Sequence, residues 1–256
     1  MLFLLNFKSY DSDNIDFTGS HLVKKISHKF LQSLIEKYEG ITMSEAIFAI
    51  EKAISKFYGG IEIKSIEKNG NYQFYKLFYN RFNEFKKDIV ALKPNETKII
   101  EKILIKILKL NSHKNTLQKI NYCKSQDGLV IGEILSRQRN SYVVITKFGT
   151  ATLNITDLIL SEKKKGLYNK GSVLKFYIKS AKLQDNKLKI TLSRKMKSIL
   201  ESDIKDIFSK PDDFFAVDRV IGEKILLFTR NSKIPKKEII ELAKLYRERV
   251  EVEVIR

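Results

Sequence analysis

Residues 187–195 read "KLKITLSRK", and this stretch decides the fold expected for the middle of the chain. Aliphatic residues at 188, 190 and 192 alternate with polar ones, which is the period of a strand that buries one face. Lys189 lies on the other face, and the strand ends at a polar corner made of Ser193, Arg194 and Lys195. The stretch therefore predicts a half-buried strand that presents positive charge to its surroundings.

Four more strand candidates precede this one, at residues 128–137, 141–148, 150–156 and 172–183. Turn-forming or polar residues separate them, and the longest break is "SEKKKGLYNKG", between the third and fourth strands. Five short strands with one long connection are typical of a small Greek-key barrel of the OB type. The alternation predicts that the following residues are mostly buried: Val130, Val143, Ile145, Leu153, Phe176, Ile190 and Leu192.

The segment before the barrel is expected to be rich in helix. Apolar residues recur at helical spacing over 22–38, and Thr42 and Glu45 form a capping box that starts a second helix. A hairpin with an Asn-Gly turn at 69–70 follows, and then helices at 97–110 and 114–124.

After the barrel, the pattern predicts a helix at 196–208 and then two strands, a helix opened by Pro235 and a final strand. The expected fold class is thus a multidomain α+β protein. Its predicted parts are a helix-rich α+β N-terminal domain at 1–126, a five-stranded OB-type barrel at 127–196, and a linker helix with a small ββαβ unit at 197–256.

Positive charge dominates the composition. The chain has a net charge of +18 and a pI near 9.7. Residues 128–197 hold fifteen Lys and Arg against four Asp and Glu, so +11 of that charge falls in the barrel segment. Such a concentration favours a polyanionic partner such as RNA, DNA or an anionic surface, and the alternative is a basic surface that is merely solvated.

Several function classes find no support in the sequence. P-loop, GxSxG and HExxH patterns are absent, and the three histidines have no metal-ligand spacing, so we expect no enzyme, no metal and no cofactor. The single cysteine, Cys123, fits a reducing compartment. The opening "MLFLLNF" is too short for a signal-peptide core, and charges interrupt the apolar stretch at 99–110, so we expect a cytoplasmic protein without a membrane segment.

The five-strand segment resembles an S1 RNA-binding domain, whose fifth strand typically ends in a sequence like "ITLSRK". The order of the whole chain is similar to the NusA family of bacterial transcription elongation and termination factors. "MSEAIFAIEKAISKFYGG" looks like that family's second helix, and "LSRKMKSILESDIKDIF" looks like its passage from the S1 domain towards a KH domain. The resemblance implies single-stranded RNA and RNA polymerase as partners, and a role in elongation, termination or antitermination.

The same resemblance implies a set of RNA-binding residues on one barrel face. Tyr142 matches an aromatic that would stack on a base, although an aromatic that only covers the barrel rim would look alike. Arg139 stands at another aromatic position and Asn154 at the usual His. The remaining members are Asp185 before the fifth strand, Lys189 on it, and Arg194 and Lys195 at its edge.

The C-terminal segment departs from the family. A KH domain holds RNA on a GXXG loop between two helices, but no two glycines of this chain are three residues apart. We therefore expect this unit to contribute packing or partner contacts and not RNA affinity. Two other functions stay open: an S1-type factor acting on mRNA at the ribosome, and a basic OB-fold scaffold that binds no nucleic acid.

Overall fold

A computed structural model describes residues 25–231 and 233–255 of the chain. The chain forms two compact units, with Ser112 as the last residue of the first and His113 as the first residue of the second. Buried apolar residues form three clusters, within 26–108, 120–192 and 200–246, so the second unit holds two of them. The three-part division at 126 and 196 remains a prediction.

The first unit contains two short helices, α1 (His28–Lys37) and α2 (Met43–Phe57). The predicted capping box is present at α2, because the Thr42 hydroxyl accepts from the Glu45 backbone N–H at 3.3 Å and the Glu45 carboxylate accepts from the Thr42 N–H at 2.8 Å. The sequence predicted that the first helix begins at residue 22, whereas α1 begins at His28. Residues 22–24 lie outside the residues that the structure describes.

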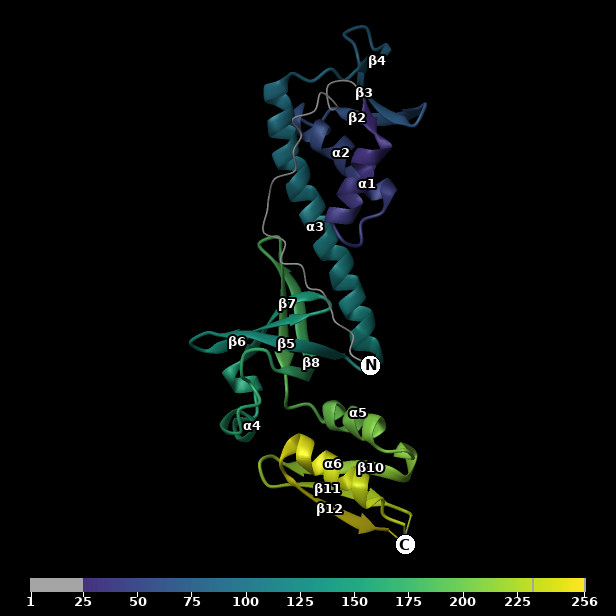
Figure 1. Ribbon diagram of the computed structural model, residues 1–256. Coiled ribbons are helices and arrows are strands. Elements are labelled where there is room, and N and C mark those ends of the chain that lie inside the picture. The colour runs from purple at the N-terminus through teal and green to yellow at the C-terminus, as the bar shows by residue number, and fades with distance from the viewer. Residues whose placement is uncertain (1–24, 232, 256) are drawn as a thin grey trace. The chain divides into compact units, whose positions relative to one another are not determined.

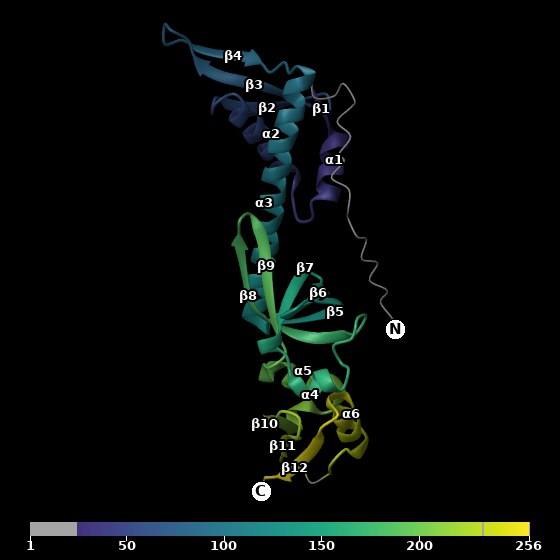
Figure 2. The same ribbon diagram turned by 90° about the vertical axis from the view of Figure 1, so that its left-hand side faces the viewer.

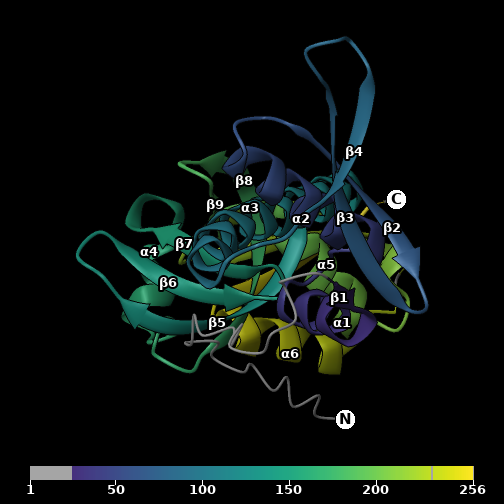
Figure 3. The same cartoon turned by 90° about the horizontal axis from the view of Figure 1, so that it is seen from above.

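A four-stranded sheet lies beside these helices (Figure 1). Its strands are β1 (Ile26–Ser27), β2 (Glu62–Lys68), β3 (Asn71–Tyr79) and β4 (Phe85–Ile89). The predicted turn joins β2 to β3, and Asn69 and Gly70 both have positive φ, as a tight two-residue hairpin requires. β4 was not predicted: all five of its residues are exposed, so no burial pattern marks it. Figure 3 shows the β3–β4 hairpin projecting away from α1 and α2.

α3 (Pro94–Gln126) is one continuous helix of 33 residues, where the sequence predicted two. The polar residues between the two predicted helices include no Gly or Pro, so nothing ends the helix there. In the second unit its last turns contact the barrel segment: Ile120 belongs to the barrel core, and His113 Nδ1 donates to the carbonyl oxygen of Asn186 at 2.8 Å.

The second unit starts with a closed barrel of strand order β5-β6-β7-β9-β8, in which β8 pairs with β5. The strands are β5 (Leu129–Arg137), β6 (Ser141–Thr146), β7 (Gly149–Asn154), β8 (Val173–Gln184) and β9 (Lys187–Ser193). β8 and β9 form a long hairpin (Figure 2). The connection between β7 and β8 contains the 3-10 turn η1 (Ile155–Asp157), which lies before the predicted long break, and the short helix α4 (Leu160–Lys164), which reaches into it.

The barrel core agrees with the predicted list except on β6. Val130, Leu153, Phe176, Ile190 and Leu192 are buried, as predicted. Val143 and Ile145 are only half-buried, and their neighbours Tyr142 and Val144 are buried instead. The prediction for β6 was wrong by one residue, because "YVVI" is apolar in both phases of the alternation and its pattern therefore does not say which face points inward.

The remaining residues form a small layer of helices and a sheet. α5 (Lys197–Ile207) is followed by the turn η2 (Pro211–Asp213), β10 (Phe214–Val220), β11 (Lys224–Thr229), α6 (Lys236–Tyr246) and β12 (Arg249–Val254). β11 pairs antiparallel with β10 and parallel with β12. α5 shares one apolar cluster with α6 and the sheet, so it belongs to this layer and is not a free linker.

In the part of the chain that is described, no helix is both long enough and apolar enough to cross a bilayer.

Candidate nucleic-acid interface

The outer surface of β7 and β9 forms a polar strip on the barrel. β7 and β9 pair in parallel, with Thr152 beside Thr191 and Leu153 beside Leu192. Because Leu153 and Leu192 are in the core, the alternate residues of both strands face outward. We call these residues the outer strip: Thr150, Thr152 and Asn154 on β7, and Lys189 and Thr191 on β9.

The carboxylates of the barrel segment do little to neutralise this surface. Asp157 forms an ion pair with Lys179 at 2.6 Å, and Glu162 forms one with Arg194 at 2.8 Å. The lysines Lys147, Lys182, Lys187 and Lys189 are exposed and form no ion pair with a carboxylate in the described residues. These four lysines therefore present part of the barrel's positive charge to solvent.

Five of the seven predicted RNA-binding residues lie on the surface or at its edge. Arg139 is exposed in the turn between β5 and β6, and Asn154 is half-buried at the same end, where Ile155 N donates to Asn140 O at 3.1 Å. Asp185 is exposed in the β8–β9 turn with a φ of +52°. Lys189 lies near that turn and donates to Gln184 Oε1 at 3.0 Å, and Lys195 is exposed just after β9.

These residues extend along the barrel and do not form one compact cluster. Lys189 and Asn154 mark opposite ends of the outer strip, about 13 Å apart if each residue advances the strand by about 3.3 Å. The hydroxyl groups of Thr152 and Thr191 lie between them. Such an arrangement can follow a backbone of phosphates and sugars, which needs spaced donors more than a single deep pocket.

Tyr142 is a correction to the predicted site. Only 4% of its surface is exposed, and it belongs to the barrel core, where its ring centroid lies 5.7 Å from that of Tyr168. A ring in this position cannot stack on a base. Tyr142 stands at the start of β6, and the phase of the strand turns its ring inward.

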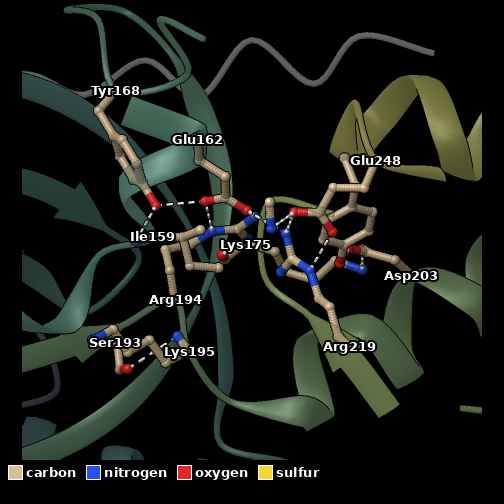
Figure 4. A network of polar contacts seen from close by, with 12 residues as sticks. Ile159, Glu162, Tyr168, Lys175, Ser193, Arg194, Lys195, Asp203, Arg219 and Glu248 are labelled. Carbon is tan, nitrogen blue, oxygen red and sulfur yellow. Dashed lines mark hydrogen bonds and ion pairs between the residues drawn. The ribbon is translucent and has the colours of Figure 1, made fainter. Parts of the chain in front are cut away.

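Arg194 is the second correction. It is 6% exposed and faces Glu162, which is fully buried (Figure 4). The pair is bidentate: Arg194 Nη2 donates to Glu162 Oε1 at 2.8 Å and Arg194 Nε donates to Oε2 at 3.1 Å. A fork of this geometry is the strongest form of carboxylate–guanidinium contact, so Arg194 is held inside the unit and not at an RNA edge.

The pair is part of a larger polar network that joins the barrel to the C-terminal layer (Figure 4). Arg219 of β10 donates to Glu162 Oε1 at 3.3 Å and to Glu248 Oε2 at 2.7 Å. Tyr168 donates to Glu162, and Tyr246 donates to Asp203 of α5. Glu162 and Glu248 are thus paired with Arg194 and Arg219. We call the residues around this pairing the Glu162 network (Glu162, Tyr168, Arg194, Arg219 and Glu248).

Burial and neighbouring charges together shift the pKa values of Glu162 and Tyr168. Burial would raise the pKa of Glu162, but the hydrogen bonds and charge of Arg194, with Tyr168 and Arg219, outweigh it and hold that pKa below its ordinary value. Burial and the negative charge of Glu162 raise the pKa of the Tyr168 phenol. Glu162 is thus ionised at neutral pH and Tyr168 carries its proton.

Sequence reasoning missed Glu162, because it lies in a lysine-rich break that was expected to be loop. Its partners Arg194 and Arg219 lie 32 and 57 residues further along the chain. Within the described residues, no group of His, Cys, Asp and Glu side chains is arranged to hold a metal ion.

We compared the chain with protein families, curated proteins and solved structures. No protein-family model matches the chain. No curated protein matches its sequence. One matching solved structure is described as a multidomain protein with nucleic acid binding domains from Streptococcus pneumoniae TIGR4. The two chains are 11% identical, the match covers 59% of this chain and 46% of that one, and the TM-score is 0.21, which is too low to carry an argument.

Proposed function

We propose that this chain is a non-catalytic RNA-binding protein of the NusA type, whose barrel holds single-stranded RNA along the outer strip. The observation that carries the proposal is the charge on the barrel surface: exposed, unpaired lysines surround the strip while Asp157 and Glu162 are locked in ion pairs. Phosphate contacts from such residues supply most of the affinity of proteins for nucleic acid, and threonine and asparagine side chains position the backbone.

The first unit is proposed to dock on a protein partner, and the family resemblance implies RNA polymerase as that partner. A feature that supports docking is the projecting β3–β4 hairpin, where Tyr79, Phe82 and Phe85 are 68%, 83% and 58% exposed. Phe82 is held at the tip because Asn80 Oδ1 accepts from the backbone N–H groups of Phe82 and Glu84. Exposed aromatic residues on a rigid support are typical of protein interfaces.

A salt titration of RNA binding tests the first half of the proposal. Binding of a single-stranded RNA 12-mer should weaken linearly in a log–log plot against salt, with a slope of about −0.7 for each phosphate contact. The control is an unrelated protein of similar size and net charge. Equal affinity and slope for the two would leave the barrel as a basic scaffold.

Co-purification tests the second half. RNA polymerase subunits recovered with the tagged chain after nuclease treatment would support the docking role, and their loss on changing Phe82 to Ser would assign it to the hairpin. Recovery of ribosomal subunits in place of polymerase would favour a factor that acts on mRNA at the ribosome.

A further inference from the structure

A pocket of about 620 Å³ lies between the last turns of α3 and the end of the barrel. Gln118, Lys119, Tyr122, Cys123 and Gln126 form its helical wall, and their spacing places them along one side of the helix. Leu129, Lys147 and Phe148 form the opposite wall. This volume is in the range of pockets that hold small planar ligands.

Both walls are fixed by local hydrogen bonds. In the turn between β6 and β7, Thr146 Oγ1 accepts from Phe148 N at 3.2 Å and donates to Gly149 O at 2.9 Å, which sets the position of Phe148. At the end of α3, Gly128 N donates to Cys123 O at 2.9 Å and Leu129 N donates to Asp127 Oδ1 at 2.8 Å. A ligand would find the pocket largely formed, which lowers the entropy cost of binding.

The chemistry of the pocket fits one base of a single-stranded nucleic acid. Tyr122 is 70% exposed and Phe148 is half-buried, so two aromatic rings are available for stacking. The side-chain amides of Gln118 and Gln126 are exposed and form no hydrogen bond to the described part of the chain, which leaves donors and acceptors for a base edge. Lys147 Nζ lies 5.1 Å from the Phe148 ring centroid and can meet a phosphate beside the stacked base.

The pocket also continues the outer strip. Thr150 at the start of the strip pairs with Ile145, and the turn that joins their strands carries Lys147 and Phe148. A strand of RNA on the strip that passes this turn therefore reaches the pocket. We propose that the pocket binds a nucleobase of single-stranded RNA by stacking on Tyr122. The proposal rests on the proposed function and adds the place where a base, and not only the backbone, is held.

The chain has no tryptophan, which makes a direct test of stacking possible. Tyr122→Trp introduces a single fluorophore at the pocket, and Tyr79→Trp introduces one at a site of nearly equal exposure, 68%, in the first unit. Titration with uridine and adenosine hexamers should quench Trp fluorescence in the first variant and leave it unchanged in the second, because a stacked base quenches the indole.

Affinity gives the second readout. Tyr122→Ala should weaken binding of the hexamers at least about fivefold, as expected for the loss of one base–aromatic stack, and Tyr79→Ala should have no effect. Both tyrosines are exposed, so neither change should disturb folding. If the hexamers bind to saturation without quenching Tyr122→Trp and with equal affinity for Tyr122→Ala, the pocket proposal is wrong while the strip proposal stands.

Variants on the strip and in the turn beside it tell which of the two proposals fails. If Lys189→Glu on the strip and Arg139→Glu in the neighbouring β5–β6 turn leave hexamer affinity unchanged while Tyr122→Ala weakens it, the pocket is the RNA site and the strip is not. If the wild-type chain binds neither hexamer, both proposals are overturned.

Discussion

Lys189 and Arg194 lie five residues apart in the same segment, carry the same charge and have opposite surroundings. Lys189 is exposed on the outer strip and its Nζ donates to the neutral Gln184 side chain, whereas Arg194 is 6% exposed and forms a bidentate pair with Glu162. The comparison teaches that the number of basic residues in a segment does not measure the charge offered to a ligand. What decides is whether the fold brings a carboxylate to each of them.

The largest expected effect is a difference in folding stability between variants of Arg194 and variants of an exposed basic residue. Arg194→Ala leaves the fully buried Glu162 without its main partner, and breaking a buried pair in this way costs about 3–5 kcal/mol in the free energy of unfolding. Lys195→Ala removes the same charge from the exposed residue next to Arg194. It should lower the free energy of unfolding by less than about 0.5 kcal/mol. Urea unfolding followed by circular dichroism measures both, and equal stability of the two variants would contradict a structural role for Arg194.

The second effect concerns Tyr142, which the sequence placed on the surface. Truncation to Ala removes a buried ring from the barrel core and should lower the free energy of unfolding by about 3 kcal/mol. RNA affinity of the folded protein should stay within about twofold, because the ring contacts Tyr168 and not the strip. A stable Tyr142→Ala variant that loses RNA binding would restore the original interpretation.

The third effect is a pH dependence of the Glu162 network. A carboxyl group whose pKa is lowered in the folded state stabilises that state fully above its unfolded pKa of about 4.3, and the contribution is lost as the pH falls through the lower, folded pKa. At pH 7, Glu162→Gln should therefore be less stable than the wild type, and the difference should shrink as the pH falls below about 4.

Unfolding curves of both proteins between about pH 3 and pH 7 measure this difference. The matched control is Glu201→Gln on α5, because Glu201 is 47% exposed in its pair with Lys197. That variant should follow the wild-type pH profile closely. A Glu162→Gln profile parallel to the wild type over the whole range would show that folding does not lower the pKa of Glu162.

Much of this fold could be predicted because its signals are local. The capping box at Thr42 and Glu45 and the Asn69-Gly70 turn each fix a backbone geometry within four residues, and both are present in the structure. The five barrel strands were predicted for the same reason, since period-two alternation and turn residues mark them one by one.

The failures share a different physical cause. β6 is apolar in both phases, so only the barrel as a whole determines that Tyr142 points inward. The Arg194 pair depends on Glu162, 32 residues earlier in a segment with no periodicity. Of the predicted site, the exposed members Arg139, Asp185, Lys189 and Lys195 were accessible to sequence reasoning, while the burial of Tyr142 and Arg194 follows from tertiary contacts.

The smallest effect tests the exposed member of the opening comparison. If Lys189 contacts a phosphate, Lys189→Ala should weaken binding to single-stranded RNA of any sequence and reduce the slope of log K against log salt by about 0.7. Stability should change by less than about 0.5 kcal/mol, since the side chain is exposed. The matched control is Lys52→Ala on α2, which removes the same charge from an exposed position in the first unit and should leave the slope unchanged. Equal slopes for both variants would mean that Lys189 adds only to the general positive field, and that the outer strip does not contact the RNA backbone at this residue.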